Sequence, residues 1–261
     1  YDRVNSFWGN SELEAVGVPE AAELAVLQRI VDQNLITADI LTEPAVLAPV
    51  SGSTQLDRKN LRRASKLMEQ AGWLVNAAGM REKDGQVFTL EVLASSPAFD
   101  RITNPMIANM KSLGIDASLN RVDGAQAMER SRAYDFDLMN HTMRMSFEPS
   151  SGLEQYFGTK AMDGSSRNLM GFSDPAADAL IELVVRAETK ADLNIRIRAL
   201  DRVLRSKRFW IPQWFKSVHT VAYYDQYGYP NPLPPYDSGE LDFWWYDAEK
   251  AKNLDAAGVL K

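Results

Sequence analysis

The stretch that decides the fold runs from residue 87 to residue 142 and reads VFTLEVLASSPAFDRITNPMIANMKSLGIDASLNRVDGAQAMERSRAYDFDLMNHT. Its first part, 87–94, alternates between apolar and polar side chains. An alternation with period two predicts a β-strand with one face buried. The apolar face of this strand consists of Phe88, Leu90, Val92 and Ala94.

A helix is predicted to follow this strand. Asn104 can cap a helix and Pro105 suits its first turn, so we expect the helix to begin there. Gly114 can end it after Leu113 by adopting a left-handed conformation. Three elements then alternate: a strand at 117–122, a helix at 125–132 and a strand at 135–142. This order predicts right-handed crossovers and an α/β fold, in which a mixed sheet is flanked by helices.

Helices are also predicted on both sides of this stretch. Asp57 and Gly72 bracket a helix over 57–71 with an apolar stripe along it, and Asp174-Pro175 marks another helix start. The other expected elements are a helix at 21–34, a long loop at 35–56, a short helix near 152–157, a helix pair joined near 189–191, and strands at 210–217 and 219–224.

Composition limits the classes of function. The chain has 261 residues, of which 45% are hydrophobic and 25% charged, with a net charge of −6; these values are typical of a folded protein and lack the basic footprint of a nucleic-acid binder. No apolar run approaches the length of a membrane span, and no signal peptide begins at Tyr1. We therefore expect a piece of a longer precursor, with weak or no ligand binding by itself.

The chemistry-bearing residues are sparse. The chain has no cysteine and only two histidines, His141 and His219, which excludes zinc-finger and Cys–His nucleophile chemistry and is compatible with export. Phosphate loops, dinucleotide fingerprints, nucleophile elbows and HExxH motifs are all missing from the sequence. Asp135 and Asp137 share a strand face, and we interpret them as solvated carboxylates. We expect no enzyme, no cofactor and no metal site, with an α/β hydrolase as the alternative from another class.

Two groups of side chains have more than one interpretation. Met139, Met143, Met145, Met162 and Met170 could line an adaptable binding surface, fill a core or, least favoured, bind copper. The C-terminal part is rich in aromatic residues, which could fill a core beneath an interface or line a wet ligand cleft.

Several short motifs follow one another along the chain in a characteristic order. They are Ala71-Gly72-Trp73, Leu113-Gly114-Ile115-Asp116, Tyr134-Asp135-Phe136-Asp137-Leu138, Gly171-Phe172-Ser173-Asp174-Pro175 and Trp210-Ile211-Pro212-Gln213-Trp214. This succession resembles the C-terminal half of the family-five extracellular solute-binding proteins, the oligopeptide, dipeptide and nickel binders of ABC importers. The opening stretch from Asn5 to Leu13 is similar to the YejA-like branch of that family.

The resemblance implies a lobe of the type II periplasmic-binding-protein fold within a larger bilobed protein. Residues 1–209 would form the second large lobe with its hinge-proximal lead-in, and residues 210–261 would return toward the first lobe. The implied role is capture of oligopeptides or modified peptides in the periplasm and delivery to the ABC permease. A monomer without nucleic-acid partners, made as a precursor with a signal peptide, is also implied.

The resemblance also points to a ligand site. Oligopeptide binders hold the peptide amino group with a carboxylate in the segment after the 135–142 strand, and the matching position here is Met145. The neighbouring Arg144 could instead face a carboxylate or phosphate, or be a solvated loop charge; His141 could be structural or lie in the cleft. The candidate ligand-binding residues are Asn5, Ser6, Phe7, His141, Arg144, Met145, Ser146 and Asn168.

Other ligands and roles remain open. An oligosaccharide or an opine would keep the receptor role, and Trp210 and Trp214 could stack on a sugar ring, although we favour a place for them in the core. A signalling receptor or a chaperone-like module on the same fold is a further alternative.

Overall fold

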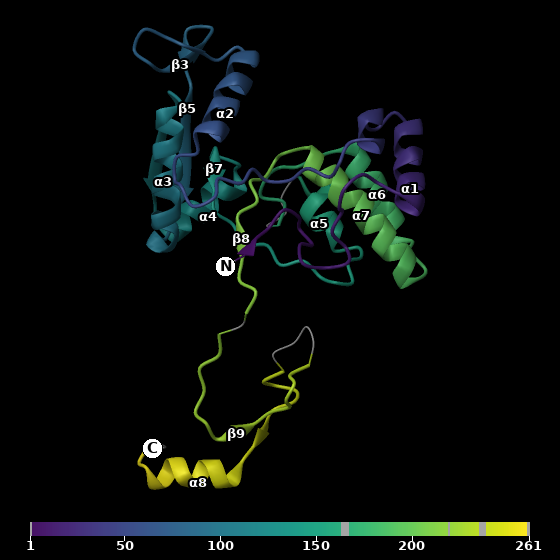
Figure 1. Cartoon of the computed structure of the whole chain (residues 1–261), viewed down its shortest axis with the longest axis vertical. Coiled ribbons are helices and arrows are strands. Elements are labelled where there is room, and N and C mark those ends of the chain that lie inside the picture. The colour runs from purple at the N-terminus through teal and green to yellow at the C-terminus, as the bar shows by residue number, and fades with distance from the viewer. Residues whose placement is uncertain (1, 163–166, 219, 235–238, 260–261) are drawn as a thin grey trace. The chain divides into compact units, whose positions relative to one another are not determined.

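The computed structural model describes residues 2–162, 167–218, 220–234 and 239–259 (Figure 1). The chain divides into two compact units. The larger unit is Val4–Gln213, and the smaller unit combines the first three residues with Trp214–Lys261. The predicted division of the chain into lobe segments at residues 209 and 210 stays a prediction.

The larger unit contains a parallel sheet built by the stretch that decides the fold. The central strand β5 (Thr89–Ala94) pairs in parallel with β6 (Asp116–Arg121) and with β7 (Leu138–Met139), in the order β6-β5-β7. The connections run through α3 (Asp100–Ser112) and α4 (Gly124–Arg132). The predicted alternation of strands and helices is therefore confirmed, although β7 is much shorter than the predicted strand 135–142.

The core of this sheet is small. Val92 and Ala117 are fully buried, with Ile107 and Ile115 beside them. An antiparallel sheet of β2 (Leu74–Val75), β3 (Arg81–Lys83) and β4 (Gln86–Val87) precedes it in the chain. The buried Arg81 joins the two parts, because its Nε donates to the Leu113 carbonyl at 2.9 Å and its Nη1 to the Trp73 carbonyl at 3.0 Å.

The predicted start of α3 is wrong. The helix begins at Asp100 rather than Asn104, and Pro105 lies inside it. A short 3-10 turn, η2 (Pro97–Phe99), leads into it, and the Ser96 hydroxyl accepts the Ala98 N–H of that turn. The proline removes one intrahelical hydrogen bond, a cost that this helix tolerates because Thr103 and Ile107 are buried on its inner side.

Helices form the larger core of the same unit. They are α1 (Ala21–Asp32), α5 (Leu153–Phe157), α6 (Pro175–Val185) and α7 (Lys190–Ser206). Asp174 accepts the N–H groups of Ala176 and Ala177 and Thr189 accepts that of Asp192, so the predicted helix starts are confirmed. Fully buried members of this core, which we call the helical core, include Leu27, Phe157, Leu180, Ile197, Leu200 and Leu204.

Helix α2 (Arg58–Gln70) begins and ends as predicted. The Asp57 carboxylate accepts the Asn60 N–H at 2.8 Å, and Gly72 has φ of +88°. Its apolar stripe is much less covered than predicted, because no residue of α2 is buried and Leu67 is 56% exposed. Two short 3-10 helices, η1 (Ala38–Leu41) and η3 (Thr159–Ala161), fall in stretches predicted as loop.

The smaller unit has little regular structure. Strand β1 (Asp2–Arg3) pairs with β8 (Trp214–Phe215), β9 (Tyr227–Gly228) pairs with β10 (Trp245–Tyr246), and α8 (Ala248–Ala256) follows. Of the predicted strands at 210–217 and 219–224 only Trp214–Phe215 forms; His219 lies outside the described residues, and residues 220–224 contain no strand. Nowhere in the described parts is there a helix long and apolar enough to cross a membrane.

Candidate functional site

The candidate site begins where the chain leaves the parallel sheet. Residues 140–148, here called the β7 exit segment, follow the carboxyl end of β7 and have no regular secondary structure. Ligands of open α/β sheets bind outside the carboxyl ends of the strands. The segment is fixed at its start, because Asn140 Nδ2 donates to the Thr103 hydroxyl at 3.1 Å.

The β7 exit segment is anchored by its methionines. Met143 and Met145 are half-buried and pack against the helical core, together with Met170. Between them Arg144 is exposed, and Ser146 follows as another exposed residue. The contacts therefore support the interpretation that these methionines fill a core. Arg144 and Ser146, which alternate with them along the chain, are exposed to solvent.

The ionisable residues of the β7 exit segment are His141, Arg144 and Glu148. Within the described part of the chain, the Arg144 side chain makes no hydrogen bond or ion pair. Partial burial lowers the pKa of His141, so the imidazole is neutral at neutral pH and can both donate and accept a hydrogen bond. The Ser146 hydroxyl accepts the Glu148 N–H at 3.0 Å.

The irregular segment before α1, residues 4–20, is here called the lead-in, and several of its side chains contact the same helical core. The Asn5 Oδ1 accepts the Ala48 N–H at 3.0 Å. The Phe7 ring stacks on Trp210, with ring centroids 4.0 Å apart and an angle of 22° between planes. Phe7, Met143 and Met145 all pack against this core although they are distant in the sequence; together with Asn5, His141, Arg144 and Ser146 we call them the candidate rim.

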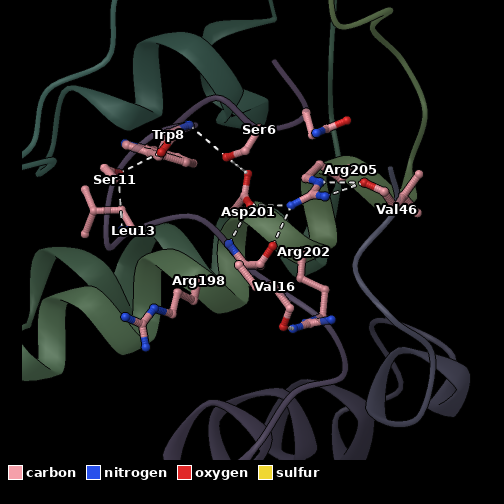
Figure 2. A network of polar contacts seen from close by, with 12 residues as sticks. Ser6, Trp8, Ser11, Leu13, Val16, Val46, Arg198, Asp201, Arg202 and Arg205 are labelled. Atoms are coloured by element: carbon pink, nitrogen blue, oxygen red, sulfur yellow. Dashed lines mark hydrogen bonds and ion pairs between the residues drawn. The ribbon is translucent and has the colours of Figure 1, made fainter. Parts of the chain in front are cut away.

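Ser6 has a buried structural role (Figure 2). Its hydroxyl donates to Asp201 Oδ1 at 2.7 Å and accepts the Trp8 N–H at 2.8 Å. Asp201 also accepts the Ala15 N–H at 2.9 Å and pairs with Arg205 at 3.0 Å. Burial raises the pKa of Asp201, while the Arg205 guanidinium and the two hydrogen bonds from Ser6 and Ala15 oppose the rise.

Two arginines of α7 extend this network. Arg205 donates to the carbonyls of Ala15 and Val46, each at 2.8 Å. Arg202 pairs with Glu23 at 2.7 Å and donates to the Gly17 carbonyl at 2.6 Å. Both arginines are almost completely buried. Because they satisfy carbonyls of the irregular lead-in and of the 35–56 stretch, these side chains help to hold both segments in place.

Asn168 is likewise buried and structural. Its Nδ2 donates to the Phe172 carbonyl and its Oδ1 accepts the Phe172 N–H, both at 2.8 Å. The Tyr134 hydroxyl donates to the Asn168 carbonyl at 3.3 Å. Ser6 and Asn168 are thus buried, whereas Asn5, Phe7, His141, Arg144, Met145 and Ser146 have exposed or half-buried side chains.

Sequence reasoning missed the α7 network. The spacing of Asp201, Arg202 and Arg205 is that of an ordinary solvent-exposed helix face. Only the neighbouring Leu200, Val203 and Leu204 indicate that these charged residues are buried. For Trp210 a place in the core was favoured over stacking on a sugar, and its ring does stack on Phe7. No group of three metal-ligating side chains gathers among the residues that the structure describes.

Comparison with known proteins identifies the family. Residues 25–164, more than half of the chain, match the family described as bacterial extracellular solute-binding proteins, family 5 Middle. The chain belongs to this family. The predicted family is therefore confirmed.

Similar curated proteins cover almost the whole chain. The probable peptide-binding protein YejA of Agrobacterium fabrum is 35% identical over 94% of this chain and 40% of its own length. The protein YejA of Escherichia coli is 30% identical over 98% of this chain and 42% of its own length. The chain thus spans about 40% of the length of these two relatives. This supports the predicted YejA-like branch.

Solved structures show the same fold. The oligopeptide-binding protein AppA of Bacillus subtilis, in complex with a nonapeptide, matches 87% of this chain and 45% of its own, with a TM-score of 0.57 and 15% identity. The mannohexaose-bound oligopeptide-binding protein of Thermotoga maritima matches 78% of this chain and 40% of its own, with a TM-score of 0.52 and 18% identity. The predicted type II periplasmic-binding-protein fold, as part of a larger protein, is confirmed.

Proposed function

We propose that this chain is part of a periplasmic receptor of an ABC importer, which captures oligopeptides or modified peptides and delivers them to the permease. The observation that carries the proposal is membership of the family 5 solute-binding proteins, together with 35% identity to a probable peptide-binding protein. A receptor of this kind needs a shaped surface and a few polar groups rather than catalytic residues. The candidate rim, with its exposed polar side chains on a packed core, meets that need.

Within this role, Arg144 is proposed to hold an acidic group of the ligand. The position that the resemblance equates with a carboxylate anchor is Met145, whose side chain packs against the helical core. The adjacent Arg144 is exposed and has a guanidinium that can bind a carboxylate or phosphate with two parallel hydrogen bonds. A ligand with a carboxylate or a phosphate-like group therefore suits this rim better than one recognised only by its free amino group.

The second candidate ligand is an oligosaccharide. Two comparisons favour it: the Thermotoga protein is described as bound to mannohexaose, and a relative 26% identical to this chain, from Agrobacterium fabrum, is described as the peptidoglycan-binding protein YepA. The half-buried Trp210 could present part of its ring to a sugar while it stacks on Phe7. An opine is the third candidate ligand for a receptor of this kind.

Uptake by a deletion strain tests the transport role. We expect a strain without the gene to lose import of labelled short peptides and to regain it on complementation. Retained import with loss of a regulatory response would instead favour a signalling receptor. Hydrolysis of peptide or glycoside substrates by the purified protein would favour the α/β hydrolase alternative.

A further inference from the structure

Helix α2 carries a row of like charge on its exposed side. Its sequence, RKNLRRASKLMEQ, contains five cations and one carboxylate. At 100° per residue the five cations fall within about 140° of the helix circumference, and they extend over about 12 Å of its length. The one carboxylate, Glu69, lies on the same arc at the C-terminal end of the row. We call this surface the cationic face; its members, all exposed, are Arg58, Lys59, Arg62, Arg63 and Lys66.

The helix itself gains nothing from this arrangement. Spacings of four residues place Arg58 next to Arg62, Lys59 next to Arg63 and Arg62 next to Lys66, and like charges at that spacing destabilise a helix. Arg58 and Lys59 also occupy the first turn, where the helix dipole favours acidic side chains. Local electrostatics therefore oppose the cationic face instead of explaining it.

Nothing in the described part of the chain neutralises these charges. None of the five side chains makes an ion pair or a hydrogen bond there. The nearest carboxylates in sequence are already engaged: Asp57 accepts the Asn60 N–H, and Glu69 accepts the Ser65 hydroxyl at 2.9 Å and pairs with Arg81 at 3.5 Å. In a chain of net charge −6 this is a local surplus of positive charge.

Exposed aliphatic side chains border the cationic face. Leu67 lies on α2 itself, and Val75 on the next strand is 55% exposed. A shallow hollow of about 350 Å³ beside Arg62 is lined by Val75 and by a sixth cation, Lys111. Cations beside exposed aliphatic groups form the pattern of surfaces that lie on anionic bilayers, where the aliphatic groups meet the acyl boundary and the cations meet the headgroups.

We propose that the cationic face of α2 binds an anionic phospholipid surface. A row of cations with aliphatic neighbours, and without hydrogen-bonding partners of its own, suits a laterally uniform negative surface better than one specific acidic protein. Such binding would restrict a receptor to diffusion along the membrane that holds its permease. Binding of α2 to the phospholipid surface does not depend on which ligand the receptor transports.

Vesicle co-sedimentation of the full chain tests the proposal. The variant combines Arg62→Gln with Lys66→Gln, and glutamine keeps the helix propensity while it removes two like-charge contacts. The control combines Arg29→Gln with Lys252→Gln, which removes the same net charge from exposed positions on α1 and α8. Vesicles contain phosphatidylcholine with or without about 30% phosphatidylglycerol, at about 0.05 M and about 0.5 M salt.

We expect binding to the anionic vesicles at low salt, no binding to pure phosphatidylcholine, and loss of binding at high salt. The α2 variant is expected to bind about tenfold or more weakly, with its thermal midpoint unchanged or raised, while the control binds like the unmodified chain. Equal binding by variant and unmodified chain, or no binding to anionic vesicles, overturns the proposal. Binding to polyglutamate without binding to vesicles also overturns it, and points to an acidic protein partner.

Discussion

The hydroxyl of Ser6 donates to the carboxylate of Asp201 at 2.7 Å, across 195 positions of the sequence, and both side chains are buried. The same hydroxyl accepts the Trp8 N–H. Ser6 is therefore one of the residues that join the irregular lead-in to α7, as does Ala15 through Asp201 and Arg205. Phe7, the next residue, is thereby held where its ring stacks on Trp210.

Replacing Ser6→Ala should destabilise the chain by about 1–3 kcal/mol, because Asp201 loses one donor and the buried Trp8 N–H loses its acceptor. Urea denaturation followed by tryptophan fluorescence measures the change. Ser53→Ala, at an exposed position, is the matched control and should change the free energy of unfolding by less than about 0.5 kcal/mol. Equal effects of the two substitutions would show that the Ser6–Asp201 contact does not hold the lead-in.

Removing Arg205, the cation that pairs with Asp201, should lower the free energy of unfolding more than Ser6→Ala does. Arg205→Met leaves Asp201 buried without its partner and frees the carbonyls of Ala15 and Val46, so we expect a loss of about 3–5 kcal/mol. The control is Arg198→Met, two turns earlier on α7 (Figure 2). Its exposed guanidinium donates to the Glu12 carbonyl at 2.7 Å. That substitution should cost about 1 kcal/mol or less; a comparable loss in both variants contradicts the assigned role of Arg205.

The Arg205→Met variant should also change the pH dependence of stability. Burial already raises the pKa of Asp201 above that of an ordinary aspartate, and removal of the opposing Arg205 charge raises it further. The folded variant then holds a proton that the unfolded chain releases, so stability is retained below the unfolded pKa and lost as pH rises through the folded one. The difference in unfolding free energy from the unmodified chain should therefore be smaller near pH 4 than near pH 8. A difference independent of pH contradicts this.

Gly114 should not tolerate a side chain. It has φ of +84°, and an added Cβ would lie 2.6 Å from the Gly79 carbonyl oxygen. Gly114→Ala is expected to destabilise the parallel-sheet part by about 2 kcal/mol or more, measured by thermal unfolding monitored by circular dichroism. Gly124→Ala is the control, because nothing lies within 4 Å of its added Cβ and its φ is not in the left-handed region; it should be neutral or slightly stabilising.

Much of the fold could be predicted from local signals in the sequence. Side-chain caps and glycine terminators place α2, α6 and α7, since these act within a few residues of each helix end. The parallel order of β5, β6 and β7 follows from the alternation of strands and helices. The start of α3 was mispredicted because Asn104-Pro105 imitates a cap while burial of Thr103 and Ile107 carries the helix past the proline.

The candidate site was less accessible to sequence reasoning, because its geometry depends on contacts between distant residues. Ser6 and Asn168 are polar residues for which a place at the ligand was predicted, yet both are buried: Ser6 bonds to Asp201, 195 positions away, and Asn168 bonds to Phe172, four positions away. The strands predicted at 210–217 and 219–224 have suitable composition, but only Trp214–Phe215 finds a partner, in β1. Strand formation needs that partner, and no local pattern specifies it.

Arg144 is expected to govern ligand affinity without governing stability. Arg144→Gln should weaken binding of an acidic ligand by about tenfold or more, because a charge-assisted hydrogen bond is lost, with the thermal midpoint almost unchanged. Isothermal titration calorimetry with the ligand released from the purified protein measures this. Arg186→Gln, at an exposed position on a different part of the unit, is the control and should bind like the unmodified protein. Unchanged affinity for Arg144→Gln contradicts the proposed contact.

Identification of the natural ligand tests the central claim most directly. Native mass spectrometry of the protein purified from the periplasm, followed by denaturing release, gives the mass of whatever occupies the site. The proposed peptide receptor predicts a set of short peptides or modified peptides, enriched in species that carry an acidic group for Arg144. A single oligosaccharide or opine mass in place of peptides contradicts the peptide assignment.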